Sequence, residues 1–152
     1  MPAAPTPDSY GKTNWFKVTL DGDPLKEESH FREVTGLDVY IDTVEIQEGG
    51  KNDGAHKRPG STRYSHIVLK RGVSQSKAFF NWVAAAVNRD VKRMGGKIAL
   101  CQPDGTSVIE WTFEKGWPCR YEGPRLDAEH NAVAFESVEI AHEGLKMQPG
   151  GK

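Results

Sequence analysis

Apolar and polar residues alternate with a period of two along most of this chain, which predicts β-strands. The first such run covers 15–20, where Phe16, Val18 and Leu20 share one face. In the run 37–47 the apolar phase slips by one residue between Ile41 and Val44, which indicates a β-bulge or a sharp bend. Further runs predict strands over 31–34, 64–70, 97–102, 107–114 and about 132–142.

One segment has the period of an α-helix. Apolar residues recur at helical spacing from Phe79 to Val91. Ser74 or Ser76 is suited to cap this helix, and Gly95-Gly96 is expected to end it. The pattern as a whole predicts a mainly β fold, a barrel or sandwich of antiparallel strands with one flanking α-helix.

The connections between these elements differ in length. Residues 103–106 read as a short hairpin turn, and 117–128 as an irregular, proline-broken connection. The stretch 48–62 is rich in glycine and charge, and a loop this long is usually functional or disordered. We expect a single domain, 1–152, with mobile tails at 1–12 and 146–152.

Composition narrows the function classes. The formal net charge is −1, so no strong field attracts nucleic acid or anionic membrane. Cys101 and Cys119 are interpreted as reduced thiols, although one bridge between them stays open. The N-terminus lacks the basic start and apolar run of a signal peptide, and no stretch is long enough to span a membrane. Work outside a cell would therefore require lysis or export as part of a particle.

Motifs for chemistry are missing from the sequence, so we expect no catalytic residue, metal or cofactor. There is no P-loop, no zinc helix and no Gly-x-Ser-x-Gly elbow. The basic run His56-Lys57-Arg58 suits phosphate, but no aromatic residue is interleaved with it, so a solvated or protein-contacting loop is the simpler interpretation. The tryptophans of the periodic elements are expected in the core or at subunit contacts.

A series of short motifs follows one another in register. The N-terminal half carries FKVTLDG at 16–22, FREVTGL at 31–37, EIQEGG at 45–50, RPG at 58–60 and IVLKRG at 67–72. The C-terminal half carries FNW at 80–82, WTF at 111–113, GWP at 116–118, YEGPRL at 121–126 and AFESVEIAHEGL at 134–145. Together they resemble the tail tube family of contractile-tailed phages and phage-derived contractile injection systems. The resemblance covers about 15–145, and its specificity comes from the number and order of the motifs. One departure is the run at 56–58, where the family often has an apolar or neutral residue.

The resemblance implies a structural protein. Six copies of a small barrel would form a ring, and rings would stack into a hollow tube that a contractile sheath drives through a membrane. Expected partners are further copies of the chain, the sheath protein, baseplate and tube-initiator proteins, and tape-measure or cargo proteins in the lumen. DNA would pass only in a phage, and no stable membrane association is expected. Assembly would take place in the bacterial cytoplasm, as part of a virion tail or an injection particle; the choice between these two stays open, as does that between the main tube subunit and a tube-initiating copy.

Three sets of residues are candidate contact surfaces of such a tube. The loop 48–62 is expected to join one ring to the next, so deleting 51–57 should leave folded subunits or single rings but no long tubes. Its proposed contact residues are Glu48, Gly49, Gly50, Lys51, Asn52, Asp53, Gly54, His56, Lys57, Arg58 and Pro59. Candidate lumen-facing residues are His66, Lys70, Glu110, Thr112 and Glu114. A sheath-facing or simply solvated helix face would carry Lys77, Asn81, Asn88 and Lys92.

Two other function classes stay open as alternatives. A monomeric β-sandwich binding module, for example for carbohydrate, would expose an aromatic platform and would not self-assemble. An enzyme with an unrecognised carboxylate pair would have a concave site with perturbed acids.

Overall fold

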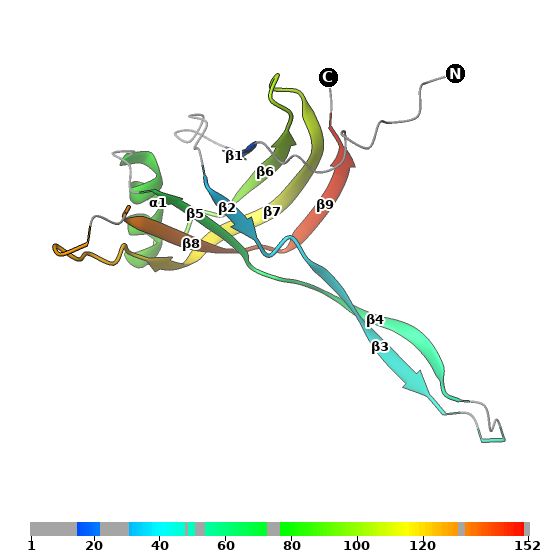
Figure 1. Cartoon of the computed structure of the whole chain (residues 1–152). Coiled ribbons are helices and arrows are strands. Elements are labelled where there is room, and N and C mark those ends of the chain that lie inside the picture. The colour runs from blue at the N-terminus through cyan, green and yellow to red at the C-terminus, as the bar shows by residue number, and fades with distance from the viewer. Residues whose placement is uncertain are drawn as a thin grey trace, which may run out of the picture.

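The chain folds into antiparallel β-sheet with a single α-helix among the residues that the structure describes, which confirms the predicted fold class (Figure 1). The structure is a computed structural model, and it describes residues 15–21, 31–47, 49–50, 54–72, 77–130 and 133–150. Its elements are β1 (Trp15–Leu20), β2 (Glu33–Thr35), β3 (Val39–Ile46), β4 (His56–Tyr64), β5 (Ile67–Gly72), α1 (Lys77–Val87), β6 (Met94–Cys101), β7 (Ser107–Glu122), β8 (Phe135–Ala141) and β9 (Gly144–Pro149).

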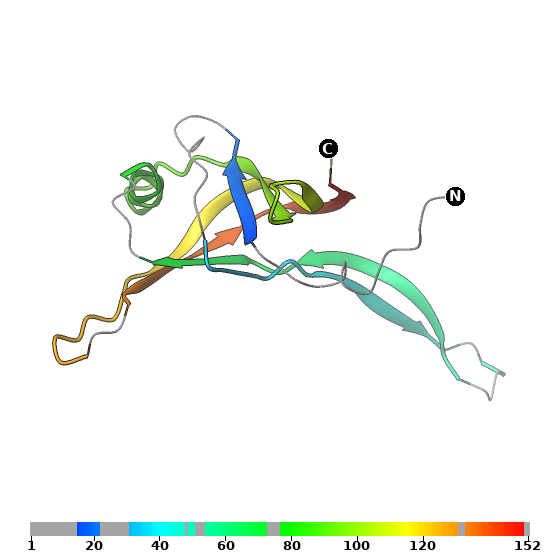
Figure 2. The same ribbon diagram turned by 45° about the horizontal axis from the view of Figure 1, so that its top comes forward.

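Seven of the strands form one strongly bent sheet. Its order is β1-β6-β7-β8-β5-β2, and β9 also pairs with β7. The bend is possible because β7 is 16 residues long. The first part of β7 pairs with β6 and β9, and the rest pairs with β8. The two parts of the sheet therefore fold over one another with a core between them, as Figure 2 shows.

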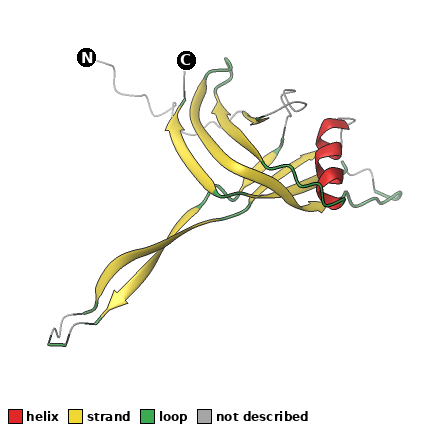
Figure 3. Ribbon diagram, turned by 180° about the vertical axis from the view of Figure 1, so that it is seen from behind, coloured by secondary structure: helices red, strands yellow, loops and turns green. Residues whose placement is uncertain are grey.

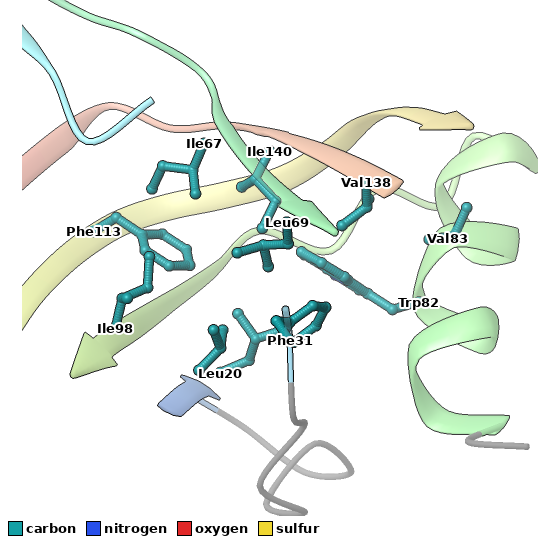
Figure 4. Packing of buried hydrophobic residues seen from close by; sticks show 11 residues of the cluster. Leu20, Phe31, Ile67, Leu69, Trp82, Val83, Ile98, Phe113, Val138 and Ile140 are labelled. Atoms are coloured by element: carbon teal, nitrogen blue, oxygen red, sulfur yellow. The ribbon is translucent and has the colours of Figure 1, made fainter. Parts of the chain in front are cut away.

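The core is contributed by both parts of this sheet and by the helix. Phe113 of β7, Ile67 of β5 and Ile140 of β8 are all 0% exposed. Figure 4 shows Trp82 and Val83 pointing from α1 toward this cluster. This arrangement agrees with the predicted inward face of β1, since Val18 and Leu20 are buried as well.

One ion pair is buried beside the core. Nε of Arg71 donates to Oε1 of Glu136 at 2.6 Å, and the hydroxyl of Tyr121 donates to Oε2 of the same carboxylate at 2.7 Å. This hydrogen bond to Glu136, together with burial, raises the pKa of Tyr121. Removing one partner of such a pair would leave a buried charge without compensation.

The strands β3 and β4 form a separate two-stranded sheet that projects from the rest of the molecule (Figures 1 and 3). We call this hairpin, Val39–Ile46 with His56–Tyr64, the arm, and the seven-stranded sheet with α1 the body. The predicted bulge is confirmed, because the register shifts between Ile41 and Thr43. At this point Gly60 and Ser61 of β4 lie opposite Asp42 of β3, so the extra residue belongs to the partner strand.

Several predicted boundaries are wrong. The segment 48–62 is not irregular throughout, because 56–62 belong to β4 and pair with β3. The connection predicted at 117–128 is strand up to Glu122, because β7 continues past its proline and pairs with β8. Residues 146–149 are not a mobile tail, since they lie in β9 and pair with the free side of β7. The other predicted tail, 1–12, lies outside the described residues.

The helix also ends earlier than expected. It stops at Val87, and Arg89 then takes a positive φ of 65°. Gly95 and Gly96 lie in β6 instead of ending the helix. The reason is packing, because a β-carbon on Gly96 would overlap the ring of Phe113. The predicted turn at 103–106 is confirmed, with Gln102 N–H donating to the Thr106 carbonyl oxygen at 2.9 Å. Neither cysteine forms a disulfide bond.

Candidate assembly surfaces

The arm exposes the apolar residues that a strand normally buries. Val39 is 48% exposed, Tyr40 56%, Ile41 59% and Val44 49%. Regular alternation along β3 places Val39 and Ile41 on one face and Tyr40 and Val44 on the other. Within the described residues neither face of the arm is covered, and an isolated two-stranded hairpin is marginally stable in water. Exposed apolar surface of this kind is typical of a site of contact with another molecule.

The root of the arm is tightly fixed to the body. Gly36 has a φ of +84°, and a β-carbon there would overlap the carbonyl oxygen of His66. Nε2 of His142 lies 2.9 Å from the carbonyl oxygen of Ser65, in the link between β4 and β5. Further out, Nε of Arg63 donates to Oδ2 of Asp42 at 2.9 Å across the bulge. The direction of the arm is thus set by close contacts at its base.

The proposed ring-to-ring residues lie toward the far end of the arm. Gly49, Gly50 and Gly54 are exposed, with no atom near the position of a β-carbon at any of them. Residues 56–59 are exposed too, but they are part of β4 and pair with 43–46. Glu48, Lys51, Asn52 and Asp53 lie outside the described residues. The loop at the end of the arm is therefore shorter than predicted, and the proposed contact residues 56–59 belong to the paired strand β4.

Three of the proposed lumen residues lie together on the outer face of β7. Glu110, Thr112 and Glu114 alternate with Trp111 and Phe113, which face the core. The neighbouring strands add basic and amide groups to the same face. Lys97 of β6 lies 3.3 Å from Glu110, and Lys146 of β9 lies 3.4 Å from Glu114. The result is a wide polar sheet face whose charges are largely paired.

Glu110 is the most enclosed acid of this face, with a side chain 12% exposed. Burial alone would raise the pKa of Glu110. Hydrogen bonds from Gln148, Ser107 and Lys97, together with the Lys97 charge, outweigh burial and lower the pKa. The carboxylate is thus held in its charged form by its neighbours.

The other two proposed lumen residues lie elsewhere. His66 immediately precedes β5 and Lys70 is within it, so both belong to the other part of the sheet. Both are exposed; Lys70 lies 4.0 Å from Glu33, and His66 lies 2.6 Å from Glu139. The fold therefore brings Glu110, Thr112 and Glu114 together and does not bring His66 and Lys70 to them.

The proposed sheath-facing residues are only partly helical. Asn81 is exposed on α1, whereas Asn88 and Lys92 lie after the helix and are exposed there. Lys77 begins α1, but its side chain lies outside the description. The same helix exposes apolar side chains that the sequence pattern assigned to its buried face. Phe80 is 63% exposed and Val87 75%.

A groove of about 710 Å³ lies beside β2, β5 and the β7–β8 loop, and its lining includes Glu33, Lys70 and Arg125. The carboxyls with shifted pKa, Asp104 and Glu110, are outside this groove, and both pKa values are lowered. A general acid needs a raised pKa, so these two carboxyls are unsuited to that role.

The comparisons with known proteins decide the family. The family model for T4-like virus tail tube protein gp19 matches residues 12–146. The chain belongs to this tail tube family. The prediction of a structural tube subunit is thereby confirmed, and the alternative of a monomeric binding module is not supported.

Solved structures agree with this tail tube assignment. A chain of the PVC extracellular contractile injection system, in its sheath-tube complex in the extended state, is 28% identical with a TM-score of 0.77, covering 89% of this chain and 88% of that one. A chain of the anti-feeding prophage tube terminating cap is 28% identical with a TM-score of 0.79, covering 98% and 94%. Hcp1 from Flavobacterium johnsoniae, at 18% identity and a TM-score of 0.54, covers 90% and 96% and shares the fold.

One further comparison, and the length of the helix, add little to the assignment of this tail tube protein. No curated protein sequence matches the chain. Within the described residues, α1 spans 11 residues, and no helix has the length and apolar character that crossing a membrane requires.

Proposed function

We propose that this tail tube protein assembles into hexameric rings, and that the rings stack into a hollow tube inside a contractile sheath. Sheath contraction would drive the tube through a target envelope, with cargo or tape-measure protein in its lumen. The proposal extends to this chain the assemblies in which its structural relatives occur, which are sheath-tube, baseplate and cap complexes. Baseplate and tube-initiator proteins are the expected partners at the tube end, and DNA passes only if the particle is a phage.

The exposed apolar surface of the arm carries this proposal. A head-to-tail contact, repeated with one sixth of a turn, closes a ring without leaving an unmatched surface. The arm has the shape for such a contact, because it projects from the body (Figure 3). It also exposes Val39, Ile41 and Val44. We therefore assign the arm to the contact between neighbouring copies.

Open strand edges supply a second contact within the ring. Within the part of the chain that the structure describes, β1 pairs only with β6, and β9 only with β7. The polar part of the sheet therefore has a free edge on each side there. Pairing of such edges between neighbours would satisfy their backbone groups and continue one barrel around the channel. The face with Glu110, Thr112 and Glu114 would then line a wet lumen. His66 and Lys70 are assigned to a different surface of the subunit.

Ring-to-ring stacking is assigned to the end of the arm. Gly49, Gly50 and Gly54 present backbone without side chains, and Lys57 and Arg58 add two positive charges on β4. The exposed end of α1, with Asn81 and Phe80, is the candidate contact for the sheath. Particle assembly would take place in the bacterial cytoplasm, with release by lysis where the particle acts outside the cell.

The proposal is tested on the purified full-length chain by size-exclusion chromatography with multi-angle light scattering, followed by negative-stain microscopy. We expect sixfold rings and rods of one constant diameter. The variant Lys57→Glu should form rings but few long rods, since Lys57 pairs with Glu45 and not with an apolar residue of the arm. Arg125→Glu, on the β7–β8 loop, is the matched charge reversal and should keep the rods. A monomer at every concentration would refute the assembly proposal.

A further inference from the structure

Three side chains with metal-binding atoms converge on the surface of the body, next to the root of the arm. They are His66 before β5, Cys119 in β7 and Glu139 in β8, and their ligand atoms all lie within 4.8 Å of one another. Nδ1 of His66 lies 2.6 Å from Oε1 of Glu139 and 3.8 Å from Sγ of Cys119. Of the three, only His66 belongs to a proposed contact surface, whereas Cys119 and Glu139 belong to none.

The cluster exists because of a bulge in β7. Pro118 pairs with Ile140 and Arg120 pairs with Glu139, so β7 takes two steps where β8 takes one. Cys119 is the extra residue. Bulges re-aim a side chain that regular alternation would direct elsewhere. Glu139 itself points outward, because it alternates with the buried residues Val138 and Ile140.

The geometry suits a metal better than a catalytic relay. In a nucleophile–histidine–acid relay the two ring nitrogens face different partners. Here the same nitrogen, Nδ1 of His66, faces both the thiol and the carboxylate. Three ligand atoms of different kinds, all within 4.8 Å of one another, are instead what a metal site with three protein ligands provides.

We propose that His66, Cys119 and Glu139 bind one zinc ion per subunit, with the fourth coordination position open. Nitrogen, sulfur and oxygen ligands together match the borderline character of Zn²⁺. Zinc–ligand bonds of about 2.0–2.3 Å separate tetrahedral ligands by roughly 3.3–3.6 Å. The distance of 3.8 Å between Cys119 and His66 is already close to this. The His66 and Glu139 side chains, 52% and 28% exposed, have room to separate by the remaining fraction of an ångström.

Zinc at this position would link three neighbouring strands at the root of the arm. The carbonyl of His66 sits against Gly36, so an ion on the His66 ring would fix the same link from which the arm departs. The Cys119 thiol must lose its proton to bind, so zinc binding would release a proton.

The test uses the reduced full-length chain without a polyhistidine tag, titrated with Co²⁺ as a spectroscopic probe. We expect one equivalent per subunit, a thiolate-to-cobalt charge-transfer band, intense tetrahedral ligand-field bands, and loss of all of these on adding one equivalent of Zn²⁺. Cys119→Ser should abolish the charge-transfer band, and His66→Gln or Glu139→Gln should weaken Zn²⁺ binding at least about tenfold.

Matched controls separate this site from other metal-binding atoms of the chain. Cys101→Ala removes the buried thiol, and His130→Gln removes an exposed histidine that also lies beside a carboxylate, Asp127. Both should keep the cobalt spectrum, and without metal Cys119→Ser should unfold at the wild-type temperature. A charge-transfer band that survives in Cys119→Ser, or a weak octahedral spectrum in the wild type, would overturn the proposal.

Discussion

The body and the arm are both antiparallel β-structure, but they differ completely in what covers their apolar side chains. In the body Ile67, Phe113 and Ile140 are fully buried between two parts of one bent sheet. In the arm no second layer exists within the described residues, and Ile41 is 59% exposed. The body therefore buries most of its apolar side chains within one subunit, whereas the arm leaves its own exposed. Assembly and folding should then respond to different substitutions.

The largest effect is expected from charges placed on the arm. Ile41→Asp combined with Val44→Asp should abolish rings and rods, because two carboxylates would have to be buried at the contact between copies. The stability of the single subunit should change by no more than about 0.5 kcal/mol, since both positions are exposed. Light scattering measures assembly, and denaturant unfolding measures the stability of the single subunit. Ile41→Val, which keeps the surface apolar, is the control; rods of normal length from the charged variant would refute the role of the arm.

The second effect concerns the body. Phe113→Ala should lower the free energy of unfolding by about 3–5 kcal/mol, because the ring is fully buried and leaves a cavity. Phe80→Ala, at a position 63% exposed on α1, is the matched control and should cost little in the isolated subunit. Urea unfolding followed by tryptophan fluorescence checks both. Similar losses for the two variants would contradict the described core.

The third effect probes the joint between body and arm. Gly36→Ala should destabilise the subunit by about 1–3 kcal/mol, since it adds backbone strain at a positive φ. It also forces a collision with the carbonyl of His66. Gly105→Ala is the control, because Gly105 has a φ of +89° but open space around it. The difference between the two variants in urea unfolding isolates the collision. Equal costs would mean that the root of the arm is less closely packed than described.

The smallest effect is a pH dependence on the polar sheet face. The pKa of Glu110 is lowered in the folded chain, so its charged form stabilises the fold above the ordinary value of 4.5. That contribution is lost as the pH falls through the lowered pKa. The stability difference between wild type and Glu110→Gln should therefore shrink on acidification. Denaturant unfolding at a series of acidic pH values tests this, with the exposed Glu129→Gln as control. A stability difference between wild type and Glu110→Gln that grows at low pH would contradict a lowered pKa of Glu110.

Strands with a regular alternation could be predicted from the sequence. In β1, Val18 and Leu20 are buried, and the polar residues Lys17 and Thr19 that alternate with them are partly exposed. An irregularity in the arm was also predicted from the slip between Ile41 and Val44, although the extra residue lies on the partner strand β4. The alternation of β1 is local, because it depends only on which residues follow one another along the strand. The motif series identified the family for the same reason.

Features that depend on a distant partner could not be predicted. Gly95-Gly96 has the local signature of a helix end, yet it lies in β6 because the ring of Phe113 occupies the space of a side chain. β9 is a strand because β7 offers it a free edge. Likewise, nothing in the sequence of β3 indicates that its apolar residues are exposed. The cluster of His66, Cys119 and Glu139 depends on pairing between strands far apart in the chain.

Backbone hydrogen exchange tests the central claim, that the arm is completed by another copy of the chain. Assembled wild type and the dispersed Ile41→Asp, Val44→Asp variant would be compared by mass spectrometry of peptic fragments. We predict that amides of β3 and β4 exchange slowly in the assembly and rapidly in the single subunit, while β5 and β8 are protected in both. Equal exchange of the arm in the two samples would show that assembly does not cover it, and would contradict the account.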